Sequence, residues 1–445
     1  MKILKFGGTS LGNAQRIKQA AKIISSEAHC IVACSAMAGV TDTLLRISEY
    51  HKKDNLECII EKKAGLRQFF EEICRELFRE QAWVSEARNL IAFHFEEMSQ
   101  WLESPFKEGK EKQLLSYGEI ITSKLLELYV KMNFDREVRL LDALKFLQLN
   151  EAGEPSISGI RQQLEKHYGP LGRGRYITQG FICLNHSGEI SNLQRGGSDY
   201  TATLLGAAFN SSSIEIWTDV DGLRNNDPRF VENTMLVRRI SFAEAAELAY
   251  FGAKILHPSC VWPASKKNIP IFLKNTLNPN SPGTIISGTV GASHIRAISA
   301  KDGISMIRIQ SARMLNAYGF LRKVFEVFDK WKTPIDVITT SEVSVSLTID
   351  NPSYLEEITE SLQRFGKVFI ERDQAILCIV GDVLACQQAY AGQVMKALKP
   401  FQIKMLSFGG SRNNLTIVLP GKEKKGALQA LQQQLFLQTP NPLFV

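Results

Sequence analysis

Residues 1–10 of the chain read MKILKFGGTS, and this stretch indicates which fold begins here. Ile3–Phe6 is a short apolar run that predicts a β-strand, and the Gly7-Gly8 pair ends it at once. The next apolar run, Cys30–Cys34, comes after a stretch whose apolar residues recur at helical spacing. A strand, a helix and a second strand in this order are typical of a parallel sheet covered by helices. The sequence therefore predicts an α/β layer from the first residues.

The same rhythm continues through the first 290 residues. Residues 56–102 are charged, poor in glycine and proline, and apolar at helical spacing, which predicts antiparallel helices and a helical insertion or lid at about 56–104. Further elements are expected downstream. They are strands at Val138–Leu141, Tyr176–Ile182, Ile214–Thr218 and Pro270–Leu273, and helices at Ser198–Phe209 and Ser241–Phe251, the second with a Ser241-x-x-Glu244 capping box.

A second kind of domain is expected in the C-terminal part. Residues 278–291 are rich in Asn, Pro, Ser, Gly and Thr, so we expect a boundary between domains near residue 290. The segments Ile335–Ile349 and Ile403–Ile417 resemble each other, and each reads as strand, polar turn and strand. With the apolar strands and amphipathic helices around them, they predict two α+β units of βαββαβ type, at about 302–373 and 374–445 within a region 296–445.

The composition excludes several classes of protein. Of the 445 residues, 44% are hydrophobic and 22% are charged, and the net charge of +7 is too small for a dense nucleic-acid-binding surface. The eight cysteines form no C-x-x-C pair and no zinc-type spacing with the seven histidines. The N-terminus lacks the apolar region of a secretory leader, and no apolar run reaches about 18 residues. We expect a reduced, cytoplasmic protein with small anionic ligands and no membrane or nucleic-acid partner.

The segment Lys5-Phe-Gly-Gly-Thr-Ser10 places an ammonium group and two glycines at the carboxyl end of the first strand, where an open parallel sheet binds ligands. Glycine N–H groups can approach phosphate oxygens closely, and a lysine offsets their charge. A tight turn with an exposed lysine is the alternative. The chain contains no G-x-x-x-x-G-K-[ST] motif and no H-R-D or D-F-G set, which disfavours the common phosphoryl-transfer folds.

Two other polar features lie on predicted helices. Arg195-Gly-Gly-Ser-Asp199 would bring N–H groups, a guanidinium and a carboxylate together at a helix N-terminus, although a hairpin followed by a helix cap is the alternative. Glu119 falls within the apolar face of a helix from about Gln113 to Met132. A buried glutamate needs a partner, which is either an ammonium-bearing substrate or a structural Arg or Lys.

A third polar stretch, Trp217–Arg229, runs from a strand end into a loop. Its position suits the base, ribose and phosphates of a nucleotide, and an ordinary surface loop is the alternative. We expect Lys5 and Arg195 to share one pocket at this edge of the sheet.

Together these stretches resemble the aspartate kinase family, within the wider amino-acid kinase fold, a mostly parallel sheet sandwiched by helices. The likeness covers essentially the whole chain, and its motifs occur in the family's order. In the tail, Met314-Leu315, Gly319-Phe-Leu321 and Val337–Glu342 look like the paired ACT-type regulatory domains of the single-function, lysine-inhibited enzymes. In the catalytic region, 1–290, the matching motifs are Lys5–Ser10, Ser35–Thr41, Gly118-Glu119, Arg195–Asp199, Trp217–Val220, Asp227–Arg229 and Phe251–Pro258.

The resemblance implies an ATP-dependent transferase that passes the γ-phosphoryl group of ATP to the β-carboxylate of L-aspartate. The product, 4-phospho-L-aspartate, begins the biosynthesis of lysine through diaminopimelate and of threonine and methionine. Both reactants are anionic, so charge neutralisation and alignment must dominate, with Mg²⁺ held mostly by phosphates and waters and by no dedicated protein ligands. An ionised carboxylate has no proton to lose, so no general base is needed. The alternatives are a glutamate or acetylglutamate kinase and a catalytically silent amino-acid sensor.

The resemblance also assigns roles to residues. The chain departs from the family at Gln194, where glycine is usual before Arg-Gly-Gly, and at Arg224, which replaces an aromatic residue near the nucleotide base. Which aspartate carboxylate Arg195 binds stays open. Lys5, Gly7, Gly8 and Asp199 would serve catalysis, Thr41, Glu119, Arg195, Gly197 and Ser198 would bind aspartate, and Lys5, Ser10, Thr218, Asp219, Arg224, Arg229 and Lys254 would bind ATP.

The tail implies feedback inhibition, with lysine favoured by resemblance and threonine left open. Lysine carries two ammonium groups, so its pocket needs carboxylates, which Asp336 and Glu342 could supply unless both are solvated strand-end charges. Exposed sheet edges in βαββαβ units would favour pairing between chains, and hence a homodimer through the ACT domains. The implied allosteric residues are Met314, Ala317, Phe320, Leu321, Asp336, Val337, Ser341 and Glu342.

Overall fold

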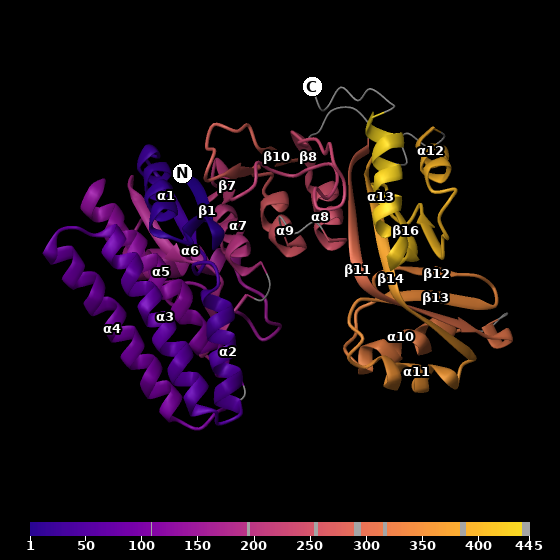
Figure 1. Ribbon diagram of the computed structural model, residues 1–445, viewed down its shortest axis with the longest axis horizontal. Coiled ribbons are helices and arrows are strands. Elements are labelled where there is room, and N and C mark those ends of the chain that lie inside the picture. The colour runs from indigo at the N-terminus through magenta and orange to yellow at the C-terminus, as the bar shows by residue number, and fades with distance from the viewer. Residues whose placement is uncertain are drawn as a thin grey trace. The chain divides into compact units, whose positions relative to one another are not determined.

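The computed structural model describes residues 1–107, 109–193, 196–252, 257–288, 295–314, 318–382 and 389–437 (Figure 1). Its contacts divide the chain into two compact units. Unit 1 comprises Met1–Leu223 and Leu256–Thr289, and unit 2 comprises Arg224–Ile255 and Val290–Val445. None of the helices in the described ranges combines the length and the apolar character that a bilayer crossing requires.

Unit 1 is built on a mostly parallel sheet. Strands β1, β2, β3, β4, β7 and β9 run parallel to their neighbours, and β10 pairs antiparallel with β9. Lys5 lies opposite Ala33 of β2 and Ile216 of β7, so the carboxyl ends of these strands meet at one edge. The order is β3-β4-β2-β1-β7-β9-β10, with β1 Lys2–Phe6, β2 Cys30–Cys34, β3 Arg139–Leu141, β4 Arg175–Gln179, β7 Ser213–Thr218, β9 Ile271–Asn275 and β10 Thr284–Ser287, beside a separate hairpin of β5 Ile182–Leu184 and β6 Ile190–Asn192.

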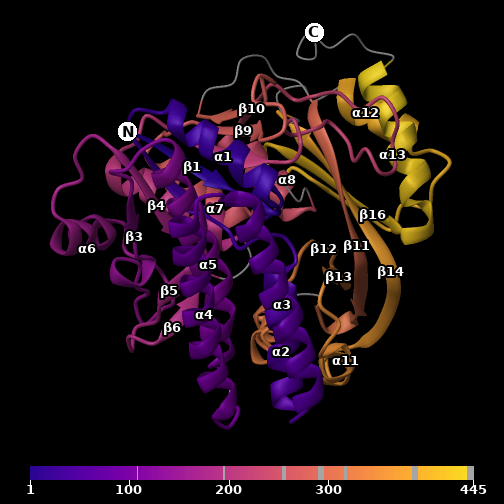
Figure 2. The same cartoon turned by 60° about the vertical axis from the view of Figure 1, so that its left-hand side comes forward.

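Helices cover both faces of this sheet. Helix α5 packs against β2, β3 and β4 with α1 beside it, and α7 packs against β1, β2 and β7 with α6 and α9 beside it. The long helices α2 to α5 lie side by side (Figures 1 and 2), which confirms the helices predicted over residues 56–102. The bounds are α1 Ala14–Ser26, α2 Val40–Lys52, α3 Leu56–Leu77, α4 Gln81–Glu103, α5 Glu111–Asn133, α6 Ile157–Tyr168, α7 Gly197–Phe209 and α9 Pro258–Lys266, with single 3-10 turns at Thr9–Leu11 and Ala143–Lys145.

The sequence explains these elements locally. Every residue of β2 is buried, as expected for a strand in the middle of a parallel sheet that helices cover on both faces. Helix α1 begins where the Asn13 side chain accepts a hydrogen bond from the N–H of Arg16, and α3 begins where Asn55 accepts one from Cys58. The main core of unit 1 lies between the sheet and helices α1 to α5.

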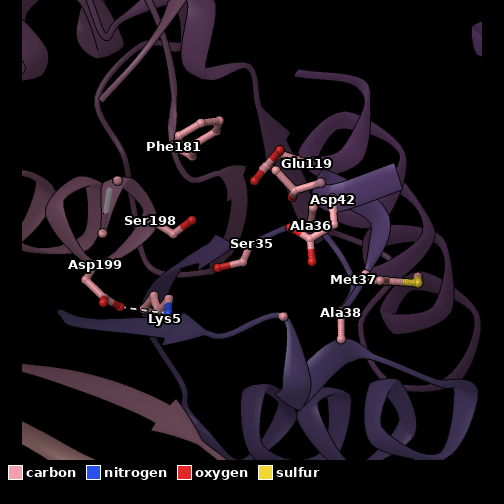
Figure 3. A pocket seen from close by; sticks show the side chains of 15 residues that line it. Lys5, Ser35, Ala36, Met37, Ala38, Asp42, Glu119, Phe181, Ser198 and Asp199 are labelled. Carbon is pink, nitrogen blue, oxygen red and sulfur yellow. Dashed lines mark ion pairs between the residues drawn. The ribbon is translucent and has the colours of Figure 1, made fainter. Parts of the chain in front are cut away.

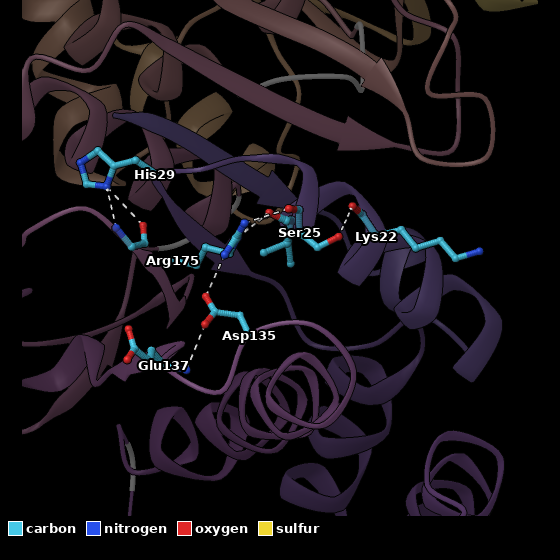
Figure 4. Close-up of polar contacts among 8 residues, drawn as sticks. Lys22, Ser25, His29, Asp135, Glu137 and Arg175 are labelled. Atoms are coloured by element: carbon cyan, nitrogen blue, oxygen red, sulfur yellow. Dashed lines mark hydrogen bonds and ion pairs between the residues drawn. The ribbon is translucent and has the colours of Figure 1, made fainter.

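Polar contacts fix the amino-terminal edge of the same sheet (Figure 4). Arg175, the first residue of β4, donates hydrogen bonds to the backbone oxygens of Ile24 at 3.3 Å and Ser25 at 2.9 Å, near the end of α1. The same guanidinium forms an ion pair with Asp135 at 2.9 Å. The Arg175 side chain thus connects α1 and the segment after α5 to the first residue of β4.

One strand prediction was wrong in part. The run Tyr176–Ile182 forms two strands, β4 and β5, with a turn at Gly180 and Phe181. The N–H of Gly180 donates to the Cys34 carbonyl at 2.8 Å, and Phe181 has a left-handed backbone with φ of 65°. A Cβ atom on Gly180 would lie 2.6 Å from the Cβ of Ser198, so the turn requires glycine where it meets α7.

Unit 2 contains an antiparallel sheet of order β12-β13-β11-β14-β16-β15. The bounds of its elements are β8 Arg239–Ser241, α8 Phe242–Tyr250, β11 Ile295–Gln310, α10 Phe320–Lys330, β12 Ile338–Thr340, β13 Ser344–Ile349, α11 Leu355–Gln363, β14 Lys367–Gly381, α12 Ala389–Ala397, β15 Met405–Phe408, β16 Asn414–Pro420 and α13 Lys424–Gln432, with short turns at Ala312–Met314, Gly421–Glu423 and Gln433–Leu437.

The two predicted βαββαβ repeats are present, and they share two long strands. The second half of β11 pairs with β13 and with the first half of β14, which makes the first repeat with α10 and α11. The second half of β14 pairs with β16 and with the first half of β11, which makes the second repeat with α12 and α13. The last strand of the second repeat, residues 295–301, therefore precedes the first repeat in the sequence, because Ala297 pairs with Val380.

Candidate active site

A pocket of about 370 Å³ opens at the carboxyl edge of the sheet in unit 1 (Figure 3). Its walls come from the ends of β1 and β2, the turn after β4, helix α5 and the N-terminus of α7. It brings together seven of the residues that the sequence analysis named. The pocket is lined by Lys5, Gly8, Ser35, Ala36, Met37, Ala38, Gly39, Thr41, Asp42, Glu119, Phe181, Gly196, Gly197, Ser198 and Asp199.

A lysine and an aspartate form an ion pair at one end of this pocket. The Lys5 ammonium lies 2.7 Å from a carboxylate oxygen of Asp199, and both side chains are largely buried. Asp199 lies in the first turn of α7, which starts after Gly196, whose φ is 76°. Exposed N–H groups and the helix dipole make a helix N-terminus attractive to anions. An ammonium group and a helix N-terminus therefore face one cavity.

The two glycines after β1 have different roles. The N–H of Gly7 donates to the Trp217 carbonyl at 3.1 Å, so this amide binds the protein and does not point to a ligand. A Cβ on Gly8 would lie 2.8 Å from the carbonyl oxygen of Ala36, and Ala38 donates to the Gly8 carbonyl at 3.1 Å. Gly8 thus lets the loop after β2 approach the loop after β1, and both loops line the pocket.

Glu119 lies on α5 toward the other end of the pocket, with Ser35 and Ser198 drawn between it and Lys5 (Figure 3). Its side chain is 3% exposed, and one carboxylate oxygen has no hydrogen-bond partner. Burial raises the pKa of Glu119 from its usual 4.5 to about 8, although a hydrogen bond from the Ala36 backbone opposes the shift. Within the described ranges no Lys or Arg forms an ion pair with it. This is the buried glutamate that the sequence predicted.

Of the residues predicted to bind ATP, Lys5 lines this pocket, whereas Ser10, Thr218 and Asp219 do not. The buried Ser10 hydroxyl donates to the Trp217 carbonyl at 3.1 Å and accepts from Thr276 at 2.7 Å, so it joins three strand ends. Thr218 ends β7, and its hydroxyl donates to Asp219 at 3.1 Å.

Four further predicted residues cannot be placed in this pocket. Arg224 and Arg229 belong to unit 2, where they contact Thr234 and Asp227 respectively. Arg195, predicted to bind aspartate, and Lys254, predicted to bind ATP, lie outside the described residues, as does Gln194.

The predicted allosteric residues lie around the first repeat of unit 2. The Asp336 side chain is 3% exposed and forms an ion pair with Lys301, so the alternative of a solvated charge was wrong for this residue. Glu342 is exposed. Of the others, Phe320 and Val337 are buried, Met314 is half-buried, Leu321 and Ser341 are exposed, and Ala317 lies outside the described residues.

Several pocket residues were not among the predicted site residues. The loop after β2 contributes Ser35, Ala36, Met37, Ala38 and Gly39, and α2 adds Asp42. In the family motif that contains this loop, a role had been predicted for Thr41 alone. The five loop positions carry small or apolar side chains, which have no charged group that would indicate a role in binding. Phe181 was missed because its left-handed backbone has no signal in the sequence beyond the preceding glycine.

Comparisons with known proteins agree with this geometry. Residues 1–275 match the amino acid kinase family. Lysine-sensitive aspartokinase 3 of Escherichia coli (strain K12) is 31% identical over 458 residues, which cover 98% of this chain and 99% of that protein. Aspartokinase 1, chloroplastic, of Arabidopsis thaliana is 31% identical over 98% of this chain and 80% of that protein.

A solved structure extends the likeness to three dimensions. The crystal structure of E. coli aspartokinase III in complex with aspartate and ADP (R-state) has a TM-score of 0.86 at 30% identity, covering 98% of this chain and 100% of that chain. The same enzyme in complex with lysine and aspartate (T-state) has a TM-score of 0.77 at 31% identity, covering 98% of this chain and 99% of that chain. The resemblance of the motifs and the predicted fold class are therefore confirmed, and the chain belongs to the amino acid kinase family and, within it, to the aspartokinases.

Proposed function

We propose that this aspartokinase transfers the γ-phosphoryl group of ATP to the β-carboxylate of L-aspartate in the pocket at the carboxyl edge of unit 1. One observation carries the proposal. A single cavity holds an ammonium group beside a helix N-terminus at one end and a buried glutamate with an unpartnered oxygen at the other. Such a cavity offers positive groups to anions and a carboxylate to one ammonium.

L-Aspartate fits these groups by its own charges. We place its α-ammonium at Glu119 and its β-carboxylate toward Lys5, with Thr41, Ser198 and the amide of Gly197 lining the path between. Arg195, immediately before Gly196 in the sequence, would hold a carboxylate of the same substrate. With aspartate bound, Glu119 is then ionised and paired with the α-ammonium, whereas without aspartate it is neutral and unpaired.

The chemistry requires two anions to meet. Lys5 offsets negative charge on the transferred phosphoryl group, and the N-terminus of α7 adds N–H donors for its oxygens. Asp199 holds the Lys5 ammonium in place, and Gly8 keeps the backbone of the two loops close. The acceptor carboxylate is ionised at neutral pH, so no side chain has to remove a proton.

ATP is proposed to approach from the ends of β7 and β1, with Thr218 and Asp219 at its site and Gly7 and Ser10 shaping the turn. Arg224, Arg229 and Lys254 keep the nucleotide role that the family motifs imply.

Mg²⁺ would neutralise phosphate charge. Phosphates and waters would hold most of the ion's coordination sites.

We also propose that residues 1–290 form the catalytic domain and 296–445 the regulatory region, and that lysine inhibits through the first repeat. Its ammonium groups would use the carboxylates of Asp336 and Glu342. A homodimer through the repeats is proposed from the exposed apolar residues Tyr318, Leu321 and Phe325 at and near α10.

A trapping assay tests the activity. Purified protein is incubated with ATP, Mg²⁺ and hydroxylamine, and with L-aspartate, L-glutamate or N-acetylglutamate in parallel, each with and without lysine or threonine. We expect the acyl hydroxamate only with aspartate, and less of it with lysine. Product with glutamate but not with aspartate would replace the proposal by the related kinase activity.

A further inference from the structure

Helix α8 in unit 2 presents one face to both repeats. Glu244, Glu247 and Tyr250 recur every three residues and so lie along one side of the helix. Glu244 forms the predicted capping box with Ser241 and an ion pair at 3.4 Å with Arg296, on the first half of β11. Each of the three residues contacts a different part of the sheet.

The middle residue of this face contacts the second repeat. The Glu247 carboxylate accepts hydrogen bonds from the Ser411 hydroxyl at 2.8 Å and from the Asn414 side chain at 2.6 Å. Both partners belong to the turn between β15 and β16 or to its end. Polar side chains therefore attach helix α8 to the second repeat at two positions, Glu244 with Arg296 and Glu247 with the turn between β15 and β16.

The last residue of the face contacts the first repeat through the Lys301 cluster, which we define as Lys301, Asp336, Asp350 and Tyr250. The Lys301 ammonium lies 2.7 Å from Asp336, 2.8 Å from Asp350 and 5.1 Å from the centre of the Tyr250 ring. The Tyr250 hydroxyl also donates a side-chain hydrogen bond to the Asp336 carboxylate. One cation thus joins two carboxylates of the first repeat to the end of α8.

The chain that leaves α8 is held against the same strand. A Cβ on Gly252 would lie 2.3 Å from the carbonyl oxygen of Ala300, the residue before Lys301, and the φ of Gly252 is 108°. Such a close backbone contact requires glycine. Four residues after Tyr250 in the sequence stands Lys254, to which the family motifs give a nucleotide role. Gly252, two residues after Tyr250, therefore lies directly against Ala300 and Lys301 of β11.

The second repeat has the reverse charges at the corresponding place. Asp336 is the second residue of the repeated segment 335–349, and Lys404 is the second residue of 403–417. Lys404 forms an ion pair at 2.6 Å with Glu371 of β14. Lys404 would repel a ligand ammonium, whereas the carboxylate of Asp336 would attract it, so the charges favour such a switch in the first repeat.

We propose that the Lys301 cluster is a switch through which a cationic effector on Asp336 moves the end of helix α8, with Gly252 just after it. This inference rests on the proposed regulation by lysine. Two ammonium groups on one carboxylate repel each other, and Lys301 already has a second carboxylate in Asp350. An effector that binds Asp336 therefore shifts Lys301 toward Asp350 and away from the Tyr250 ring. The loss of the cation–π contact releases the last turn of α8 from the first repeat.

Thermodynamic coupling between two ligands tests the switch, because the coupling is reciprocal and does not depend on catalytic rates. L-Lysine binding to the full-length protein is measured by calorimetry with and without a saturating non-hydrolysable ATP analogue, for the wild type and for Tyr250→Leu. We expect the analogue to weaken lysine binding about fivefold or more in the wild type. In Tyr250→Leu we expect the ratio of the lysine dissociation constants with and without the analogue to be near one. Its lysine affinity in the absence of the analogue should change less than threefold.

Three further variants make the test specific. Tyr250→Phe keeps the ring and removes the hydroxyl that bonds with Asp336, so its ratio should lie between those of the wild type and Tyr250→Leu. Lys301→Met should bind lysine more tightly, because it leaves Asp336 without its internal cation, and should also lose the ratio. Lys404→Met removes the reversed pair of the second repeat and should keep the ratio, so it is the matched control for Lys301→Met.

The outcomes separate the two proposals. If the wild type binds no lysine, the proposed regulation by lysine is wrong. The switch is wrong if the wild type binds lysine without coupling to the analogue, or if Tyr250→Leu couples as strongly as the wild type. In either case lysine would regulate the enzyme through other residues. A melting curve for each variant confirms that it is folded.

Discussion

The two edges of the sheet in unit 1 use the same residue type in opposite ways. Lys2 and Lys5 are three residues apart on β1. At the amino edge, Lys2 forms ion pairs with Glu27 at 2.6 Å and Glu215 at 3.4 Å, away from the pocket. At the carboxyl edge, Lys5 pairs with Asp199 inside the pocket. A lysine at the first edge stabilises the fold, and one at the second edge is available to a ligand.

Two buried carboxylates show the same difference. Glu215, on β7, has lysines on both sides, with Lys2 at 3.4 Å and Lys274 at 3.5 Å. Glu119 has no such cation within the described residues, and one of its oxygens has no partner. A buried carboxylate without a cation is unfavourable for folding, and it persists where a ligand supplies the charge. The contrast between satisfied and unsatisfied charges therefore locates the site independently of any motif.

Removing the lysine at each edge should break this comparison most clearly. Lys5→Ala should lower kcat by about a thousandfold, since loss of one charge-stabilising donor alone costs about 10²- to 10³-fold. Lys2→Ala on the same strand should leave kcat within twofold and lower stability by less than about 1 kcal/mol, because the Lys2 pair is partly exposed. Hydroxamate assays and chemical unfolding measure both effects. Equal losses of kcat in the two variants would contradict the assignment of the edges.

Much of this contrast could be predicted from the sequence, because it depends on strand ends. The apolar run at Ile3–Phe6 and the glycines after it placed Lys5 at a carboxyl edge, and the helical spacing around Glu119 placed that residue in an apolar face. Both predictions are confirmed by the pocket. Local periodicity was sufficient here, because burial of one face follows from secondary structure alone.

Other features depended on contacts between distant segments, which periodicity does not encode. Ser10 was predicted to bind ATP, but its hydroxyl bonds with the Trp217 carbonyl and Thr276, more than 200 residues away. The strand at 295–301 completes a repeat that begins 70 or more residues later, because β11 and β14 pair antiparallel. Only the folded chain brings such groups together.

The protonation state of Glu119 should further distinguish the carboxyl edge of the sheet from the amino edge. Since its pKa is raised to about 8 in the empty pocket, Glu119 is mostly protonated at pH 7. An ammonium group beside it favours the ionised form, so aspartate binding should release close to one proton at pH 7. Affinity should rise with pH between 6 and 8 and level off near 8. Calorimetry in two buffers of different ionisation enthalpy measures the released proton.

The glutamine variant is the control for that experiment. Glu119→Gln should bind aspartate about a hundredfold more weakly, as expected for loss of a buried charge partner, and should release no proton. Without aspartate, the wild type should lose stability as pH rises from 4.5 to 8, because the folded-state pKa is raised above the unfolded value, and the variant should not. Proton release that persists in Glu119→Gln would assign it to another group.

The smallest expected effect on catalysis belongs to the amino edge. Arg175→Ala should lower the free energy of unfolding by about 2 kcal/mol. Breaking a fully buried ion pair costs about 3–5 kcal/mol, and the loss is smaller here because Arg175 and Asp135 are each about one-fifth exposed. The variant also removes the side-chain donor from the carbonyls of Ile24 and Ser25, although Ile24 still accepts a hydrogen bond from the Glu27 N–H. Its kcat and its KM for aspartate should stay within twofold of the wild type, as measured in the hydroxamate assay.

Replacement of the partner separates the charge from the backbone contacts. Asp135→Asn removes the ion pair and keeps both hydrogen bonds from Arg175 to the end of α1, so it should cost less than half of the loss in Arg175→Ala. Lysine at position 175 should not restore stability, because one ammonium cannot reach three acceptors in the geometry of a guanidinium. If Arg175→Ala instead lowered kcat tenfold at unchanged stability, the amino edge would be part of the site, and satisfied charges would no longer distinguish structure from function in this sheet.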